Sequence, residues 1–165
     1  MIDMGATGQK KDAGAPVRCT WGHICSLSSI DKERNNISLF NIIVQWNFPQ
    51  AAFDQYETSG KIVVIELVPF EIVLQWMRTI DIEGINDELP FEFRIKTFDP
   101  TGQAIQETVT PAFMPRGAKR HVLRIQTNAV PITVPGDYRI DIEVKTGEIY
   151  QNTCAIPIEI RARSA

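Results

Sequence analysis

Leucine is scarce in this sequence, and so are stretches long enough for a helix. The chain has only 6 leucines, against 33 isoleucines and valines combined. Branching at Cβ restricts the first side-chain torsion, which suits a pleated sheet better than a helix. The 10 prolines and 10 glycines interrupt the chain so often that few windows are long enough for a helix. These counts leave little room for long helices and predict an all-β protein with short strands and many turns.

The sequence also lacks an excess of charge of either sign. Its 17 lysines and arginines nearly balance 20 aspartates and glutamates, which gives a formal net charge of -3 and a pI near 5.4. Non-specific binding to nucleic acid requires a basic footprint, so we expect no nucleic-acid partner. With 44% hydrophobic and 22% charged residues, the composition is that of a globular protein and excludes a disordered chain.

No segment has the pattern of a signal peptide or a membrane span. Residues 1–16 are rich in glycine, alanine and lysine and have no apolar core, so they are predicted to be a flexible leader. The most apolar stretch, Ile62–Met77, carries Glu66, Pro69 and Glu71, which a transmembrane segment tolerates poorly. We therefore expect a cytoplasmic protein without membrane contact.

Cysteines are few: Cys19, Cys25 and Cys154. An odd number without a Cys-x-x-Cys pair does not form the disulfide framework of small secreted proteins. Cys19 and Cys25 stand on one predicted strand, where about 20 Å separates them, too far for a disulfide bond. The thiols are therefore predicted to be reduced.

Alternation of apolar and polar residues recurs along most of the chain and is typical of half-buried strands. It predicts eight or nine strands joined by turns such as Asp99–Gly102. Two packed sheets satisfy this pattern, because each strand offers one apolar face to a shared core. We predict a leader over residues 1–16, one immunoglobulin-like antiparallel β-sandwich over 17–162 and a tail over 163–165, with a closed barrel as the alternative. The Cys–Trp–Cys signature of immunoglobulins is absent, so the prediction concerns architecture alone.

The first strands give more detailed expectations. Val17–Ile30 predicts a strand with one face formed by Cys19, Trp21, His23, Cys25 and Leu27. Ile37–Trp46 is apolar on both faces and predicts the antiparallel return strand, in the middle of a sheet. Trp21 and Trp76 are expected in the core, whereas Trp46 fits either the core or a ligand platform.

Later segments are predicted less uniformly. Lys61–Leu67 fits a strand and a single helical turn equally, and Pro69 is expected to interrupt the chain before a strand over Phe70–Arg78. Gln103–Val109 is more polar and predicts an edge strand. Three segments are expected to be binding loops: residues 47–60, 79–90 and 110–117.

Several motifs stand together in one order: a cysteine-bearing first strand followed by Asp31, then N-N-I-S-L-F-N-I-I (Asn35–Ile43), P-F-E-I-V-L-Q-W-M-R (Pro69–Arg78), F-R-I-K-T-F-D-P-T-G (Phe93–Gly102), H-V-L-R-I (His121–Ile125), P-G-D-Y-R-I-D-I-E-V (Pro135–Val144) and A-I-P-I-E-I (Ala155–Ile160). Over nearly the whole chain after Val17 they resemble a bacterial family of uncharacterised small proteins, a domain of unknown function. D-P-T-G is a generic sandwich turn, whereas L-F-N-I-I after a polar turn is more particular. The resemblance implies a bacterial, cytoplasmic setting and a sandwich fold, but no activity and no functional residue.

Recognisable catalytic motifs are absent from the sequence. A hydrolase triad needs a histidine base beside its nucleophile, and the only histidines are His23 and His121. The sequence has no G-x-S-x-G elbow, no P-loop and no G-x-G-x-x-G loop. We therefore expect a protein that is not an enzyme and needs no cofactor.

A metal site is the sharpest local alternative. Cys19, His23 and Cys25 share the predicted face of the first strand, and about 6.6 Å along the strand separates His23 from Cys25, a spacing that suits two ligands of one ion. Cys154 adds a thiolate if the last strand lies alongside. Because zinc sites usually use knuckles on turns and free cysteine is common in cores, core packing is the prediction for these residues and no metal site is assigned.

A basic run, formed by Arg116, Lys119, Arg120 and Arg124, is the last candidate. It suits an anion or an acidic partner surface, and the alternative is a solvated strand face balanced by acidic neighbours. Altogether we predict a non-catalytic protein-interaction or assembly module that binds a protein partner or itself through sheet edges and end loops. A metalloprotein or small enzyme built on Cys19, His23 and Cys25, and an anion-binding module built on the basic run, are the alternatives.

Overall fold

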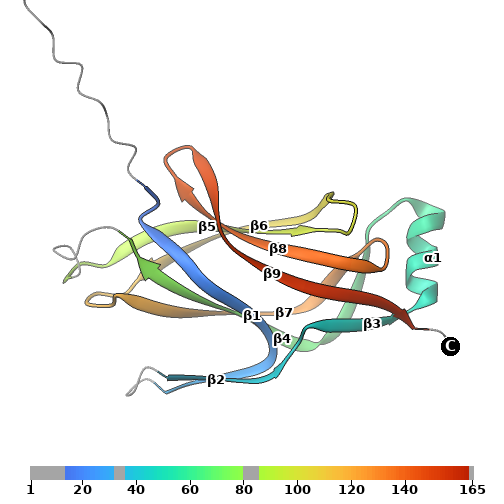
Figure 1. Cartoon of the computed structure of the whole chain (residues 1–165), viewed down its shortest axis with the longest axis horizontal. Helices are drawn as coiled ribbons and strands as arrows, with labels where there is room; N and C mark the ends of the chain where they lie inside the picture. Colours follow the sequence, from blue (N-terminus) through green and yellow to red (C-terminus); the bar gives the residue numbers. More distant parts are fainter. Residues whose placement is uncertain (1–13, 32–35, 80–85, 164–165) are drawn as a thin grey trace, which may run out of the picture.

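Nine strands and one short helix make up the part of the chain that the computed structural model describes, residues 14–31, 36–79 and 86–163 (Figure 1). Strands account for 74% of it, which confirms the predicted class and strand number. In chain order the elements are β1 (Val17–Asp31), β2 (Asn36–Ile42), β3 (Gln45–Pro49), α1 (Gln50–Ser59), β4 (Val63–Arg78), β5 (Leu89–Phe98), β6 (Ala104–Met114), β7 (Arg120–Ile132), β8 (Gly136–Thr146) and β9 (Ile149–Arg163).

The strands form two sheets, one of which curls into a half-barrel. The four-stranded sheet has the order β2-β1-β4-β7, and the five-stranded sheet has the order β3-β9-β8-β5-β6. Neighbouring strands are antiparallel except β3 and β9, which are parallel, so the prediction of a wholly antiparallel fold is wrong at β3. The edge strands are β2, β7, β3 and β6, which confirms the edge position predicted for Gln103–Val109.

The predicted return strand over Ile37–Trp46 changes sheets in its middle. The backbone N–H of Ile43 donates to the carbonyl oxygen of Ile24 in β1 at 2.8 Å, whereas the carbonyl oxygen of Val44 accepts from Glu159 in β9 at 3.0 Å. The segment is apolar on both faces because it serves two sheets in turn. Its first half, β2, is therefore an edge strand rather than the central strand predicted, and about half of the Phe40 side chain is exposed.

Prolines lie inside strands more often than predicted. Lys61–Leu67 lies mostly within β4, which runs on through Pro69 with a shift of register between Glu66 and Phe70. Such a shift lets a strand absorb a residue without a backbone N–H. The edge strand β6 likewise continues through Pro111 to Met114, so only the end of the predicted loop over 110–117 is a turn.

Helix α1 occupies the segment predicted to be an irregular loop over residues 47–60. Its Phe53 is buried, and Gly60 ends it in the left-handed conformation (φ 66°) while donating to the carbonyl oxygen of Tyr56. No helix among the described residues is long and apolar enough to cross a membrane. Of the loop predicted over 79–90, residues 80–85 lie outside the described residues.

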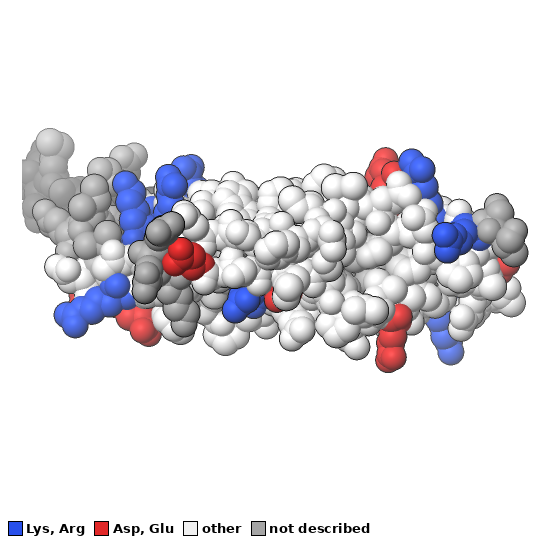
Figure 2. Space-filling view, turned by 90° about the horizontal axis from the view of Figure 1, so that it is seen from below, with Lys and Arg blue, Asp and Glu red and all other residues white. Residues whose placement is uncertain are grey.

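The core lies between the sheets and is rich in isoleucine and aromatic residues. Trp76 in β4 is fully buried, and its ring centroid lies 4.8 Å from that of Phe91 and 5.1 Å from that of Phe93, both in β5. On one side of the sandwich β1 packs against β9, and on the other β7 lies near β6. Charged side chains on the face shown in Figure 2 lie mainly toward the two ends of the molecule, and its middle is largely uncharged.

Candidate functional site

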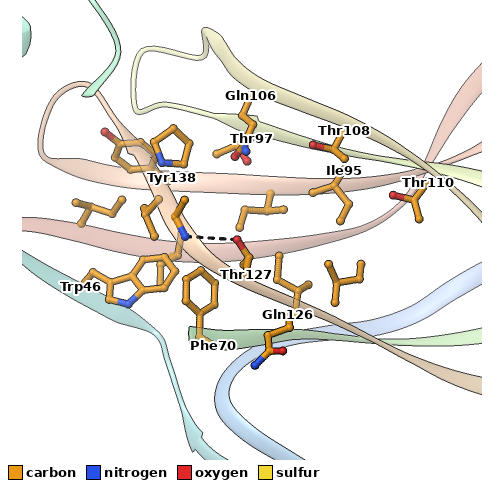
Figure 3. A pocket seen from close by; sticks show the side chains of 18 residues that line it. Trp46, Phe70, Ile95, Thr97, Gln106, Thr108, Thr110, Gln126, Thr127 and Tyr138 are labelled. Atoms are coloured by element: carbon orange, nitrogen blue, oxygen red, sulfur yellow. Dashed lines mark hydrogen bonds between the residues drawn. The ribbon is translucent and has the colours of Figure 1, made fainter. Parts of the chain in front are cut away.

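A cleft of about 220 Å³ opens between the two sheets beside β6 and β7 (Figure 3). Strands of both sheets line it: β4 and β7 of the four-stranded sheet, and β3, β5, β6, β8 and β9 of the five-stranded sheet. None of its 18 lining residues is charged. Each is an aliphatic residue, an aromatic residue, a proline, a threonine or a glutamine. The cleft therefore offers no opposite charge to a charged group.

The floor of the cleft is apolar. It is formed mainly by isoleucines of both sheets, together with Phe70 and Trp46, whose ring centroids lie 5.1 Å apart in an edge-to-face arrangement. Trp46 is half-buried: it packs against the core cluster and also lines the cleft, so the structure leaves both sequence expectations for this residue open. A ligand that covers this apolar surface removes it from water, and this burial favours binding.

One wall carries hydroxyl and amide groups at regular spacing. Gln106, Thr108 and Thr110 occupy alternate positions of β6 and share the face that lines the cleft, opposite Trp46 and Phe70 (Figure 3). Glu107 and Val109, the residues between them, do not line it. This wall can donate and accept hydrogen bonds without carrying charge.

The edge of β7 forms the border of the cleft. Residues 125–127 and 129–131 all line it. Successive residues of a strand point to opposite faces, so a run of consecutive lining residues means that the strand meets the cleft along its edge. In the described part of the chain, no strand pairs with that edge of β7. Its backbone groups are therefore placed to pair with an incoming strand.

A buried polar network supports one end of the cleft. The hydroxyl of Tyr138 donates to the carbonyl oxygen of Val134 at 2.7 Å and accepts from the backbone N–H of Thr133 at 2.9 Å. The hydroxyl of Thr133 donates to Asp99 Oδ2 at 2.8 Å, and Asp99 Oδ1 accepts from the backbone N–H groups of Thr101 and Gln103, each at 2.9 Å. The network fixes Tyr138, which lines the cleft.

The same network makes the stability of the protein depend on pH. Burial acts to raise the pKa of Asp99, but the hydrogen bonds from Thr101, Thr133 and Gln103 outweigh it and hold the pKa below the ordinary value of 3.8. A carboxyl whose pKa is lower in the folded state stabilises that state above its ordinary pKa, and the contribution is lost as the pH falls through the folded value.

We therefore expect Asp99→Asn to lower the free energy of unfolding by about 1.5–3 kcal/mol at pH 7, the range for hydrogen bonds to a charged group. The difference from the native protein should shrink as the pH falls below 4, because protonation removes the same charge from Asp99. Urea unfolding at pH 7 and pH 3 measures both effects, with the exposed Asp137→Asn as the control. A difference that stays constant with pH would contradict this role for Asp99.

The three candidate metal ligands of the first strand, Cys19, His23 and Cys25, do not all lie together. The register of β1 shifts between Cys19 and Trp21, so Cys19 packs in the core while Gly22 and Ile24 take the following inward positions. His23 is exposed, and Cys25 is buried outside the core cluster, opposite Glu71 of β4. The expectation of one shared face is therefore wrong for Cys19, whereas His23 and Cys25 stay on one face beyond the register shift. Core packing holds for Cys19 but not for the exposed His23. No cluster of three or more His, Cys, Asp or Glu residues suited to a metal occurs among the described residues.

The basic run is divided between a turn and a strand. Arg116 lies in the β6–β7 connection and donates to the carbonyl oxygen of Asn86, and Lys119 is exposed in the same connection. Arg120 and Arg124 lie on β7 at positions alternating with the inward-facing Leu123 and so face away from the cleft. Arg124 donates to the carbonyl oxygen of Ser28 at 3.4 Å. The run thus forms no part of the cleft.

Comparisons with known proteins give similarity of structure alone. No family model and no curated protein matches the chain. Among solved structures, the C-terminal domain of Wzt matches with a TM-score of 0.46 and 8% identity, covering 91% of this chain and 76% of that one. The alkylpurine DNA glycosylase AlkC of Pseudomonas fluorescens matches with a TM-score of 0.46 and 12% identity, covering 90% and 31%. A β-glucuronidase of Bacteroides uniformis matches with a TM-score of 0.37 and 12% identity, covering 60% and 12%.

Proposed function

We propose that this protein is a non-catalytic interaction module that holds an extended, uncharged segment of a partner protein in the cleft between its sheets. The observation that carries the proposal is the combination of an uncharged cleft with the unpaired edge of β7 at its border. An extended peptide that pairs with a sheet edge gains affinity from backbone hydrogen bonds and specificity from pockets that receive alternate side chains. The cleft offers both.

The position of the partner segment follows from the strand order. A segment paired with β7 extends the four-stranded sheet by one strand and covers the inner faces of β5 and β6, which form the far wall. Every second side chain of the segment then points into the cleft. Those side chains meet Ile95 and Thr97 of β5 and the Gln106–Thr108–Thr110 row of β6.

The size and neutrality of the cleft define its ligand. Its volume of about 220 Å³ is below the roughly 300–1,000 Å³ of pockets that enclose drug-sized molecules, so it suits a few side chains of a longer partner. A charged side chain would lose its hydration without gaining an opposite charge, which is costly. We therefore expect small or branched apolar residues, serine and threonine at the inward positions.

Selection from a display library of random ten-residue peptides tests the proposal. The immobilised native protein should enrich peptides that are uncharged at alternate positions and rich in β-branched residues. Enrichment of acidic or basic peptides, or of peptides without any alternating pattern, would contradict it. The binding of the selected peptides then provides the assay for the cleft variants described below.

A second surface favours association between copies of this protein. Leu27 of β1 and Phe40 of β2 are directly paired and about half exposed, and the neighbouring Ile42 is exposed as well. The edge strand β2 (Asn36–Ile42) contains no charged residue and no proline, the devices that usually protect an edge. Two copies can pair their β2 strands antiparallel about a twofold axis. Because β2 carries no charged residue, this pairing places no like charges opposite each other.

Light scattering combined with gel filtration tests this association. We expect the native protein to form a dimer whose share rises with concentration, and Phe40→Lys to be monomeric because a lysine at the edge disfavours strand pairing. The control is Val68→Lys, which places a lysine at an exposed residue outside the patch. A native protein that is monomeric at all concentrations would contradict the dimer.

We also infer that the two sheets form an immunoglobulin-like sandwich. Tyr138 supports this inference, because it lies near the start of β8 and its hydroxyl bonds to the backbone of Thr133 and Val134 upstream. A tyrosine corner of this kind is a hallmark of immunoglobulin-type folds. The bacterial and cytoplasmic setting stays a prediction of the sequence.

A further inference from the structure

Cys19 and Cys154, which are distant in sequence, meet where the two sheets pack together. Cys19 belongs to β1 and Cys154 to β9, on the side of the sandwich away from β6 and β7. The backbone N–H of Cys19 donates to Thr153 Oγ1 at 3.3 Å, which fixes the two strands at this point. Cys154 packs against the buried cluster that contains Cys19, and the Cys19 thiol donates to the carbonyl oxygen of Trp21 at 3.2 Å.

The two thiols differ in exposure and in acidity. Cys19 is 2% exposed, whereas Cys154 is only partly buried. The neighbouring Cys19 thiol lowers the pKa of Cys154, and the neighbouring Cys154, together with burial, raises the pKa of Cys19 far above its ordinary range. The lowered pKa favours the thiolate at the more accessible sulfur, and the thiolate is the form that reacts with disulfides.

We propose that Cys19 and Cys154 form a reversible disulfide bond between the two sheets when the protein meets a small-molecule disulfide such as oxidised glutathione. In the first step the Cys154 thiolate attacks one sulfur of the oxidant and releases one glutathione thiolate, which leaves a mixed disulfide on Cys154. In the second step the Cys19 thiol gives its proton to solvent and its sulfur attacks the Cys154 sulfur, which releases the second glutathione. Two protein thiols are oxidised, and one oxidised glutathione becomes two reduced molecules.

Each position suits one step of this exchange. Cys154 is the accessible, attacking thiol, and Cys19 is the shielded, resolving thiol held beside it. Cys25 cannot take part, because it lies six residues along β1 from Cys19 and is buried outside the core cluster. The bond would close a loop of nearly the whole folded chain, which restricts the unfolded state most strongly. Oxidation should therefore raise the melting temperature by roughly 5–15 °C.

Peptide mapping after oxidation tests the proposal. The native protein is incubated with oxidised glutathione, then unfolded, alkylated and digested. We expect a peptide pair linked through Cys19 and Cys154, with Cys25 alkylated, and the linked protein should melt at the higher temperature. The result that would overturn the proposal is a native protein in which Cys19 stays alkylated, whether Cys154 is free or carries glutathione.

Two serine variants separate the steps. In Cys19→Ser the mixed disulfide should accumulate on Cys154, because the resolving thiol is missing. Cys25→Ser is the matched control and should form the Cys19–Cys154 link as the native protein does. A mixed disulfide that fails to accumulate in a folded Cys19→Ser protein would contradict the order of the two steps. If that variant does not fold, the link in the native protein still decides the proposal. None of these readouts depends on binding in the cleft.

Discussion

Replacing Trp76 by alanine should lower the free energy of unfolding by about 3–5 kcal/mol, the usual cost of deleting a buried large aromatic side chain. Trp76 is fully buried, and its indole packs against Phe91 and Phe93 of the opposite sheet. The alanine variant leaves a cavity between the sheets and removes both aromatic contacts. The total free energy of unfolding of many domains is only about 5–15 kcal/mol. We therefore expect the urea concentration at the midpoint of unfolding to fall strongly.

Two further tryptophan variants separate packing from polarity. In the described part of the structure, the buried indole N–H of Trp76 has no hydrogen-bond partner, so Trp76→Phe removes an unsatisfied donor and should cost only about 1 kcal/mol. Trp21→Ala is the matched control, because Trp21 is only partly buried and contacts His23 rather than the core cluster. A Trp76→Ala protein that is no less stable than Trp21→Ala would contradict the core described above.

Replacing Thr108 by arginine should weaken the binding of a selected peptide by at least about 100-fold. Thr108 is an exposed residue on the cleft wall, so the variant is expected to fold. The added guanidinium would enter an uncharged site, where an approaching apolar segment buries it without an opposite charge. A cost of about 2.8 kcal/mol is enough for a 100-fold loss of affinity.

The neighbouring residue supplies the control for this variant. Val109 is exposed and lies on the same strand, but it faces away from the cleft. Val109→Arg introduces the same charge one residue away and should change the affinity less than about 2-fold, the effect of a distant charge in water. Isothermal titration calorimetry with one selected peptide measures the affinity of both variants. Equal losses in the two variants would place the peptide outside the cleft.

The alternation of apolar and polar residues predicts most of the strands, because a strand in a two-sheet fold buries the side chains of one face and exposes those of the other. Tyr138–Val144 shows why: its apolar residues are buried, and the residues between them face outward or form ion pairs. Alternation does not reveal where a strand absorbs an extra residue. The sequence pattern therefore does not show the register shift between Cys19 and Trp21, which separates Cys19 from the other two candidate metal ligands, His23 and Cys25.

Two other errors have local causes. Helix α1 has only one buried residue, Phe53, and no side-chain cap at its start, so the sequence shows neither an apolar stripe nor a signal for where the helix begins. The change of sheet between Ile43 and Val44 depends on which strands lie beside the segment. A segment that serves two sheets in turn has the same apolar sequence pattern as a central strand. Both features are set by tertiary packing rather than by local pattern.

The cleft was missed because its residues come from seven strands that only the strand order brings together. One signal was present in the sequence: Gln103–Val109 was predicted as a polar edge strand. On the inward face of β6, Gln106, Thr108 and Thr110 stand where a core strand would carry apolar residues. A polar row on the inner face of an edge strand indicates a surface that solvent or a ligand reaches.

Hydrogen exchange of the backbone amides, measured with and without a selected peptide, tests the central claim most directly. If an extended segment pairs with β7, the amides of residues 125–130 should exchange more slowly in the complex, because those that face the open edge gain hydrogen bonds to the peptide. The amides of β2 should exchange at the same rate in both samples. Protection confined to β2, or no slowing along β7 at a saturating peptide concentration, would contradict binding in the cleft.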